Sequence, residues 1–247
     1  MGMNYDYEVA LTGNPNTGKS TIFNTLTGLN QHTGNWPGKS VVRAEGRHQS
    51  KEKVLKLVDL PGTYSLLANS IEEQVSRDYL CFSRPDCTVV VADATCLERN
   101  LNLALQVLEI TPRVVLCVNM IDEAKRKRIH IDTDSLSLEL GVPVVATIAR
   151  AGYGMDKLVL SVLEVASGLK TPVPCTVKYD KNLEEAISKI EPKLIELLGE
   201  EFNTRWLSLR LLDRDRTVTE AIKQWLSVKG GGEKGRVSSL VGGEVMV

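Results

Sequence analysis

Eight residues near the N-terminus have the types and spacing of a phosphate-binding loop. They read Gly-x-x-x-x-Gly-Lys-Ser and lie between an apolar, strand-like run at 9–11 and a helix-like run. Glycines let such a loop curl until successive backbone N–H groups point at phosphate oxygens. Lys19 would reach the β- and γ-phosphates, and the Ser20 hydroxyl would bind a Mg²⁺ that bridges them. The predicted nucleoside triphosphate contacts are Gly13, Asn14, Pro15, Asn16, Thr17, Gly18, Lys19, Ser20 and Thr21. The alternative is a glycine-rich turn with a surface lysine.

A second motif, Asp59-Leu60-Pro61-Gly62, follows a half-buried strand predicted near 54–58. The Asp59 carboxylate would hold the metal through a water molecule, and the backbone N–H of Gly62 would approach the γ-phosphate. Alone, such a sequence is also typical of a tight turn after a strand. Its position downstream of the phosphate loop favours a switch segment that loses a contact when the γ-phosphate leaves.

The third motif, Asn119-Met120-Ile121-Asp122, follows a β-branched run that ends at residue 118. A carboxylate at Asp122 can accept two hydrogen bonds, from N1–H and the 2-amino group of guanine, whereas adenine offers no such pair. Asn119 would link this base site to the phosphate loop. An Asn–Asp pair at a strand end can instead be a helix cap. The two preceding motifs favour base recognition, and therefore GTP or GDP as the ligand.

A fourth segment, Thr147-Ile148-Ala149-Arg150, follows the run at 142–146. GTPases commonly carry Ser-Ala here, with a backbone N–H that contacts the guanine oxygen. Ala149 retains that backbone group, whereas Ile148 stands where serine is usual and has no hydroxyl to brace the loop. We expect the base to be held less firmly than in close relatives.

The motifs in this order resemble the cytosolic G domain of FeoB, the ferrous-iron transporter. The most specific parts of the resemblance are Asn35-Trp36-Pro37-Gly38 and the run Asp59-Leu60-Pro61-Gly62-Thr63-Tyr64-Ser65-Leu66. It extends over roughly residues 5–168, and more loosely over the helical stretch that follows. It implies a switch domain at the cytoplasmic face of the bacterial inner membrane that regulates ferrous-iron transport. A downstream membrane-spanning permease region, absent from this chain, would be its partner.

The resemblance also assigns metal contacts. Gly38, Lys39 and Ser40 would form the first switch, where Ser40 replaces the family's threonine and would complete Mg²⁺ coordination with Ser20 and Asp59. A serine lacks the methyl group that restricts χ1, so closing the switch would cost more entropy. Asn16 would help to bind K⁺ beside the phosphates. The alternative for Asn16 is selection for loop geometry alone.

Hydrolysis is expected to be slow. Thr63 stands where a Ras-like enzyme has the glutamine that orients the attacking water, so electrostatic stabilisation must carry the reaction. The predicted catalytic groups are Lys19, Asn16 and the backbone of Gly62. A non-catalytic guanine-nucleotide sensor therefore remains an alternative. A ribosome- or RNA-associated GTPase is another, although it should add a basic RNA-binding module.

Composition agrees with an intracellular nucleotide-binding protein that does not bind nucleic acid. The net charge is −1, and the basic cluster Lys125–Arg128 is most simply a solvated loop. Five cysteines without a C-x-x-C pair indicate a reduced compartment. His32, His48 and His130 form no metal-binding pattern. No uncharged apolar run approaches the roughly 18–20 residues that span a bilayer. Because the family that the chain resembles is embedded in the membrane further downstream, the resemblance implies that this chain is an excised soluble part.

Alternating strand and helix patterns predict an α/β fold with a doubly wound, mostly parallel sheet and a small C-terminal helical subdomain. The predicted domains are a G domain at 1–170, a linker at 171–181, a helical subdomain at 182–228 and a flexible tail at 229–247. Within the subdomain we predict a helix break at Pro192 and a capping box formed by Thr217 and Glu220. The oligomeric state is left open. The predicted strands lie near 7–12, 40–46, 54–58, 88–93, 113–118 and 142–147, and the helices near 19–28, 70–80, 99–110, 133–140 and 154–167.

Overall fold

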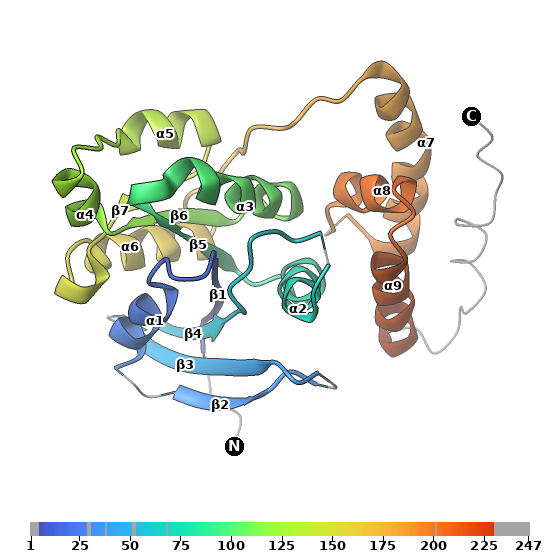
Figure 1. Cartoon of the computed structure of the whole chain (residues 1–247). Helices are drawn as coiled ribbons and strands as arrows, with labels where there is room; N and C mark the ends of the chain where they lie inside the picture. The colour runs from blue at the N-terminus through green and yellow to red at the C-terminus, as the bar shows by residue number, and fades with distance from the viewer. Residues whose placement is uncertain are drawn as a thin grey trace. The chain divides into compact units, whose positions relative to one another are not determined.

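The computed structural model describes residues 5–28, 31–37, 39–50, 53–67, 69–200 and 202–229. The chain divides between Thr176 and Val177 into two compact units (Figure 1). The first unit contains the sheet and every predicted nucleotide motif, and the second is helical. In the described part of the chain, no helix is both long enough and apolar enough to cross a membrane.

The first unit is built on a seven-stranded sheet in the order β2-β3-β4-β1-β5-β6-β7. Strands β4, β1, β5, β6 and β7 run parallel, whereas β3 is antiparallel to both β2 and β4. This confirms the predicted α/β fold with a mostly parallel sheet. The strands span Tyr7–Gly13 (β1), Gln31–Asn35 (β2), Val42–Ser50 (β3), Lys53–Asp59 (β4), Cys87–Asp93 (β5), Val114–Asn119 (β6) and Val144–Ala146 (β7).

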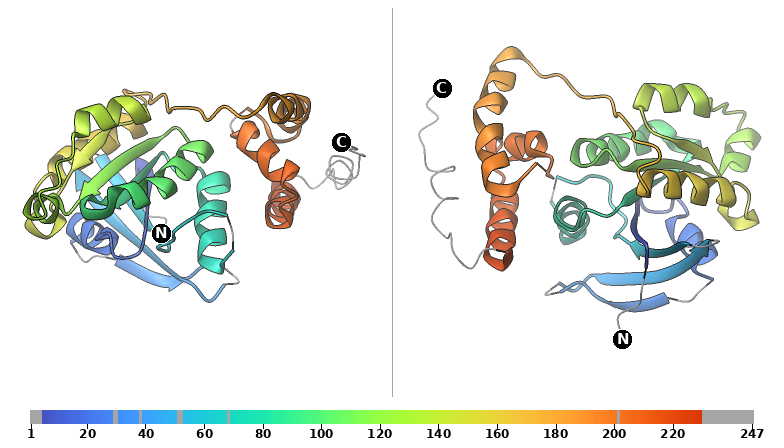
Figure 2. Two further views of the ribbon diagram at one scale, coloured as in Figure 1. Left: turned by 45° about the horizontal axis from the view of Figure 1, so that its top comes forward. Right: turned by 180° about the vertical axis from the view of Figure 1, so that it is seen from behind.

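Helices cover both faces of the sheet. Helices α1 and α6 lie on one face and α2 and α3 on the other, as Figures 1 and 2 show. Helix α2 continues into a π-helical turn at Tyr79–Ser83, and short 3₁₀ turns follow β5 and β7. The helices span Lys19–Thr27 (α1), Ile71–Asp78 (α2), Leu97–Ile110 (α3), Ile121–Arg126 (α4), Thr133–Leu140 (α5) and Met155–Ala166 (α6).

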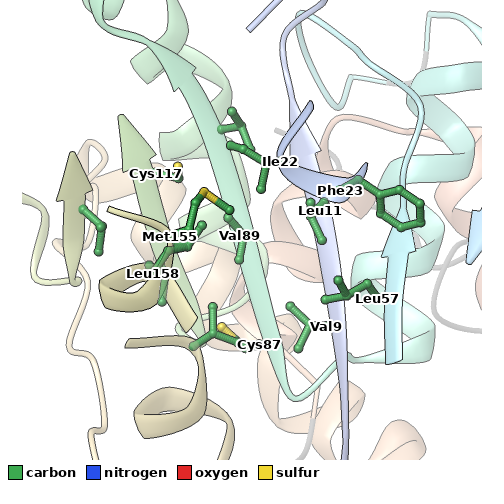
Figure 3. Close-up of a cluster of buried hydrophobic side chains, with 14 of the residues drawn as sticks. Val9, Leu11, Ile22, Phe23, Leu57, Cys87, Val89, Cys117, Met155 and Leu158 are labelled. Carbon is green, nitrogen blue, oxygen red and sulfur yellow. The ribbon is translucent and has the colours of Figure 1, made fainter. Parts of the chain in front are cut away.

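One hydrophobic core lies between the sheet and helices α1 and α6 (Figure 3). Alternate residues of a strand point to opposite faces, so Val9 and Leu11 of β1 share this core and are fully buried. Phe23 of α1 packs against it from one helix and Leu158 of α6 from the other. Burying side chains of this size stabilises the unit by about 1.5–3 kcal/mol each. The core therefore fixes α1, and with it the loop that precedes this helix.

Parallel topology places the motifs at one edge of the sheet. Gly13, Asp59 and Asn119 are the last residues of β1, β4 and β6, and the segment at 147–150 follows β7. Because these strands are parallel, their carboxyl ends meet at the same edge. Two elements of the first unit were not predicted. They are β2, the outermost strand on one side of the sheet, and the short helix α4.

The helical unit consists of α7 (Lys181–Leu198), α8 (Thr204–Leu212) and α9 (Arg216–Lys229). The predicted break at Pro192 is wrong, because α7 continues through it. Proline removes one backbone hydrogen bond and costs about 3 kcal/mol in a helix interior. Ile187, Leu194 and Leu198 form one buried stripe on both sides of the proline, and α7 packs against α8. This shared packing outweighs the lost hydrogen bond.

The predicted capping box at Thr217 is also wrong. Asp215 caps α9, since its Oδ1 accepts hydrogen bonds from the backbone N–H groups of Thr217 (2.9 Å) and Val218 (3.1 Å). The carboxylate precedes Arg216, the first residue of the helix, and so reaches the first free amides. Trp206 is buried and Trp225 packs edge to face on Phe202, in agreement with the predicted packing role of both tryptophans. Apart from Lys229, which ends α9, the predicted flexible tail lies outside the described residues.

Candidate functional site

The phosphate loop has a backbone that only particular residues can adopt. Gly18 has φ +84°, and a Cβ there would lie 2.3 Å from Nδ2 of Asn119. A Cβ on Gly13 would lie 2.5 Å from the carbonyl oxygen of Val91. Asn16 also has a positive φ, 67°, in the left-handed region that asparagine tolerates better than most residues. Gly13 is therefore required by the close approach of the Val91 backbone, and Gly18 by its positive φ and the nearby Asn119 side chain.

Helix α1 starts directly after this loop without a side-chain cap. Its N-cap residue is Gly18, and no acidic residue lies in the first turn. The first amides of a helix lack partners within the helix and carry a partial positive charge. Ser20 and Thr21 are exposed in this turn. The α1 N-terminus can therefore bind a phosphate group.

Lys19 forms an ion pair with Asp59, the last residue of β4. The two side chains are only 10% and 17% exposed. Burial raises the pKa of the Asp59 carboxyl, and the charge and hydrogen bond of Lys19 partly oppose that rise. The predicted phosphate-binding cation and the predicted metal-binding carboxylate thus neutralise each other. Both are already within reach of one ligand.

Backbone hydrogen bonds attach the segment after β4 to the phosphate loop. Leu60 N–H donates to the carbonyl oxygen of Leu11 (2.9 Å), and Thr63 N–H donates to that of Gly13 (3.2 Å). Gly62 lies beside Pro15, since a Cβ on Gly62 would be 3.5 Å from Cα of Pro15. The Thr63 side chain is buried. The Thr63 side chain therefore cannot orient a water molecule as an exposed glutamine at this position would.

The first predicted switch is only partly assembled. Ser40 is exposed, and in the described part of the chain no hydrogen bond links it to Ser20 or Asp59. Lys39 N–H donates to the carbonyl oxygen of Trp36 (3.0 Å), which forms a turn, and Gly38 lies outside the described residues. Trp36 is buried edge to face against Tyr79, with ring centroids 5.3 Å apart. The structure thus pairs Asp59 with Lys19, the neighbour of Ser20, whereas Ser40 takes no part in this contact.

Asn119 joins the base segment to the phosphate loop through three hydrogen bonds. Its Nδ2 donates to the carbonyl oxygen of Thr17 (3.0 Å). Its Oδ1 accepts from the Thr147 hydroxyl (3.1 Å) and from the backbone N–H of Ala149 (3.0 Å). The next residue, Met120, has φ 62° and turns the chain toward α4. The predicted link between the two loops is present, and Asn119 is buried within it.

A pocket of about 160 Å³ lies beside Asn119. Inside it, Ile148 stands where serine was expected, and its N–H donates to the carbonyl oxygen of Tyr153 (3.1 Å). The loop is thus braced by Thr147 and this backbone bond, in place of a serine hydroxyl. The pocket is lined by Gly18, Thr21, Asn119, Met120, Asp122, Glu123, Ile148, Ala149 and Arg150.

Two charged residues of this pocket were not foreseen, Glu123 and Arg150. The guanidinium of Arg150 donates to Oδ2 of Asp122 and lies 3.4 Å from Oε1 of Glu123. Partial desolvation alone would raise the pKa of the Asp122 carboxyl, but the hydrogen bond and charge of Arg150 outweigh it and lower the pKa. Asp122 is therefore ionised and able to accept two hydrogen bonds at neutral pH. The sequence did offer one indication that Arg150 lines the pocket, since it directly follows Ala149, a predicted base contact.

The fold and the arrangement of these loops define a P-loop GTPase domain with a C-terminal helical domain. Residues 7–162 match the family model of ferrous iron transport protein B, and residues 179–236 match that of the FeoB cytosolic helical domain. The chain belongs to the FeoB family.

Individual relatives agree with this assignment. The Fe(2+) transporter FeoB of Escherichia coli K12 is 37% identical over 84% of this chain, and that of Methanocaldococcus jannaschii is 44% identical over 88%. The chain spans only 27% and 32% of those two proteins. The cytosolic domain of Thermotoga maritima FeoB in a GDP form superposes with a TM-score of 0.80, at 34% identity over 97% of this chain and 93% of that one. That of Legionella pneumophila FeoB gives 0.79 at 32% identity, over 95% and 93%.

Proposed function

We propose that this chain binds GTP and GDP and hydrolyses GTP slowly, as the nucleotide switch of a ferrous-iron transporter. The observation that carries the proposal is Asn119, which links the phosphate loop at Thr17 to the base pocket at Ala149. The hydrogen bonds of this one side chain thus set the distance between a phosphate site and a base site. Crystal structures of the T. maritima FeoB cytosolic domain in GDP and GMPPNP forms support this reading.

Asp122 is the proposed base reader. Its carboxylate lines the pocket and is ionised, so it can accept the N1–H and 2-amino hydrogen bonds of guanine. Adenine would leave both oxygens without those donors. The backbone N–H of Ala149, which donates to Oδ1 of Asn119, is the proposed contact of the base oxygen. Ile148 and Met120 supply apolar pocket walls.

The residues at the phosphate end fit a Mg²⁺-bound triphosphate. Asp59 and the Ser20 hydroxyl supply the oxygen ligands that this ion prefers. When bound, Mg²⁺ would neutralise charge on the β- and γ-phosphates. Lys19, released from Asp59, would contact the phosphates as a point charge, and the N–H of Gly62 would bind the γ-phosphate. Ser40 would join the metal only after the first switch closes over the site.

The proposed hydrolysis relies on electrostatics. Thr63 is buried, so no glutamine-like side chain orients water from that position. The transferring phosphoryl group would be stabilised by the backbone N–H groups of the phosphate loop and by Lys19. A monovalent cation held by the exposed Asn16 would add further positive charge. A guanine-nucleotide sensor that does not hydrolyse GTP is the second candidate, favoured by the same buried Thr63. The net charge of −1 and the absence of a basic module argue against an RNA-associated GTPase.

At the level of the whole protein, we propose that the chain lies on the cytoplasmic face of the bacterial inner membrane. Its nucleotide state would regulate a downstream region that conducts Fe²⁺. The curated relatives, which are named Fe(2+) transporters and are about three times as long as this chain, support this proposal. Iron is then cargo. Among the described residues, no group of three His, Cys, Asp or Glu side chains could hold a metal ion.

Two measurements test the proposal. Titration should give much tighter binding of GDP than of ADP, and single-turnover assays with excess protein should convert GTP to GDP. Lys19→Ala should abolish both by removing the phosphate contact. Selective GDP binding without turnover would favour the sensor, whereas equal GDP and ADP affinities would overturn both readings.

A further inference from the structure

Arg150 stands at the mouth of the base pocket, where its own contacts overlap with those of the proposed ligand. Its Nη2 donates to Oδ2 of Asp122 and lies 3.4 Å from Oε1 of Glu123. The side chain is 64% exposed, so it can leave the carboxylate without disturbing the core. Asp122 is 26% exposed and lies deeper in the pocket.

A guanidinium group and the edge of guanine present the same kind of hydrogen-bond donor. Both are planar and offer adjacent N–H groups that match the two oxygens of a carboxylate. If guanine is to place N1–H and its 2-amino group on Asp122, both carboxylate oxygens are needed. One of them, Oδ2, is already accepting a hydrogen bond from Arg150.

Glu123 offers Arg150 a second partner. The guanidinium already lies within ion-pair distance of this neighbouring carboxylate, so Arg150 can leave Asp122 without becoming an unpaired charge. Arg126 contacts the same two carboxylates, but its closer partner is Glu123, whereas the closer partner of Arg150 is Asp122. It pairs closely with Glu123 and lies 3.9 Å from Asp122.

We propose that Arg150 competes with guanine for Asp122 and thereby weakens nucleotide binding and lowers discrimination for the 2-amino group. The inference rests on the proposed function, because it requires that Asp122 reads guanine. Arg150 is a specificity-determining residue in this scheme, and it transfers to Glu123 when guanine binds. Removing its guanidinium should tighten GDP binding.

The expected effect is small and directional. An exposed ion pair of this kind changes an equilibrium by up to about fivefold. Arg150→Ala should therefore tighten GDP binding by about two- to fivefold. IDP lacks the 2-amino group, so its N1–H needs only one oxygen of Asp122 and Arg150 can keep the other. The same substitution should leave IDP affinity nearly unchanged.

The experiment measures GDP and IDP affinities of the whole chain by titration for wild type, Arg150→Ala and Arg126→Ala. Arg126→Ala is the matched control, because it removes an equally exposed arginine that binds mainly Glu123. An increase in the GDP-to-IDP affinity ratio for Arg150→Ala, without one for Arg126→Ala, is expected. Arg150→Lys should show an intermediate ratio, since an ammonium is a point charge without the planar donor pair.

Several outcomes would overturn the inference. Weaker GDP binding by Arg150→Ala would mean that Arg150 supports the bound base. Equal tightening of GDP and IDP would show a general effect on the loop, and no change in either affinity would show that Arg150 does not compete. In each of these cases a wild-type preference for GDP over ADP leaves the proposed function intact. Failure of the wild type to prefer GDP would overturn both.

Discussion

The side-chain amide of Asn119 donates a hydrogen bond to the carbonyl oxygen of Thr17, a residue 102 positions earlier in the chain. This contact is buried, and the same side chain accepts two hydrogen bonds from the loop after β7. A single residue therefore holds the two ends of the candidate site at a fixed separation. The contact is as much a structural bond as a proposed part of nucleotide recognition.

Asn119→Ala should lower the free energy of unfolding and weaken GDP binding together. Three hydrogen bonds are lost, at about 1 kcal/mol each, and Thr17 and Ala149 keep buried polar groups without partners. Asn100→Ala is the control, because Asn100 is equally buried and makes three hydrogen bonds, one of them to a sulfur, on α3 outside the site. Denaturant unfolding should show losses of about 2–3 kcal/mol for Asn119→Ala and comparable ones for Asn100→Ala. Only Asn119→Ala should weaken GDP binding, and equal GDP affinities would contradict its linking role.

Asp122→Asn should move base preference from guanine toward xanthine. The amide offers one acceptor and one donor in place of two acceptors, and the 2-oxo group of xanthine accepts where guanine donates. Loss of a charge-assisted hydrogen bond should lower GDP affinity at least about tenfold. Titrations with GDP and XDP check this. Undiminished GDP affinity with no gain for XDP would show that Asp122 does not read the base.

Ser40→Ala should slow hydrolysis and leave GDP affinity nearly unchanged. The exposed Ser40 makes no hydrogen bond with the described Ser20 or Asp59, so its contribution requires a closed switch and a γ-phosphate. Hydrolysis should fall by about a hundredfold or more. Ser20→Ala is the comparison, and it should weaken binding of both GDP and a GTP analogue. Equal losses of the two nucleotides in Ser40→Ala would place Ser40 outside the switch.

Potassium should accelerate GTP turnover through Asn16. A cation beside the phosphates would supply charge that other GTPases obtain from an arginine finger, worth about 10³–10⁵ in rate. Replacing Na⁺ by K⁺ at constant ionic strength should raise the wild-type rate by at least about tenfold. Asn16 has φ 67°, so Asn16→Ala would strain the backbone as well as remove the amide. Asn16→Gly removes the amide without that strain.

The two variants separate the side chain from the loop geometry. A flat response to K⁺ in both Asn16→Gly and Asn16→Ala supports a role for the amide oxygen. A response retained in Asn16→Gly alone would assign Asn16 to loop conformation. Identical wild-type rates in the two salts would rule out potassium activation.

Acid should remove one stabilising contact of the helical unit. Hydrogen bonds from Arg205 lower the pKa of the Glu184 carboxyl from 4.5 to about 2. Because the folded pKa is depressed, this stabilisation is complete above pH 4.5 and is lost as the pH falls toward 2. Glu184→Gln should lower the Tm of the whole chain near pH 6, and the difference from wild type should shrink between pH 4.5 and 2.

Far-UV circular dichroism during heating measures this difference. Glu185→Gln on the same helix is the control, since Glu185 is exposed and has a 3.9 Å contact with Lys181. A constant Tm difference across this pH range would show that the Glu184–Arg205 pair does not set the acid sensitivity.

Sequence reasoning identified the parallel strands and the positions of their motifs because both depend on local patterns. Buried strands such as Val114–Asn119 are continuous apolar runs, and the phosphate loop is defined by glycine spacing. The edge strand Gln31–Asn35 has no such run, since its residues are polar or glycine and its pairing with β3 is a tertiary contact. Helix α4 is only six residues long, which is too short to show a helical period in the sequence.

The error at Pro192 and the missed contact of Arg150 share a physical origin. Pro192 breaks an isolated helix, but the buried stripe that continues past it depends on packing against α8. The pairing of Arg150 with Asp122 likewise joins residues 28 positions apart. Such contacts follow from the fold and cannot be read from spacing alone.

The burial of Trp36 would make the proposed first switch visible by fluorescence. It is the only one of the three tryptophans within the first unit, and its indole packs on Tyr79 and beneath the Arg43 guanidinium. If the segment around Ser40 closes over a triphosphate, the ring environment changes and so should its emission. In the double variant Trp206→Phe, Trp225→Phe, intrinsic fluorescence would therefore report the switch of this chain without any attached dye.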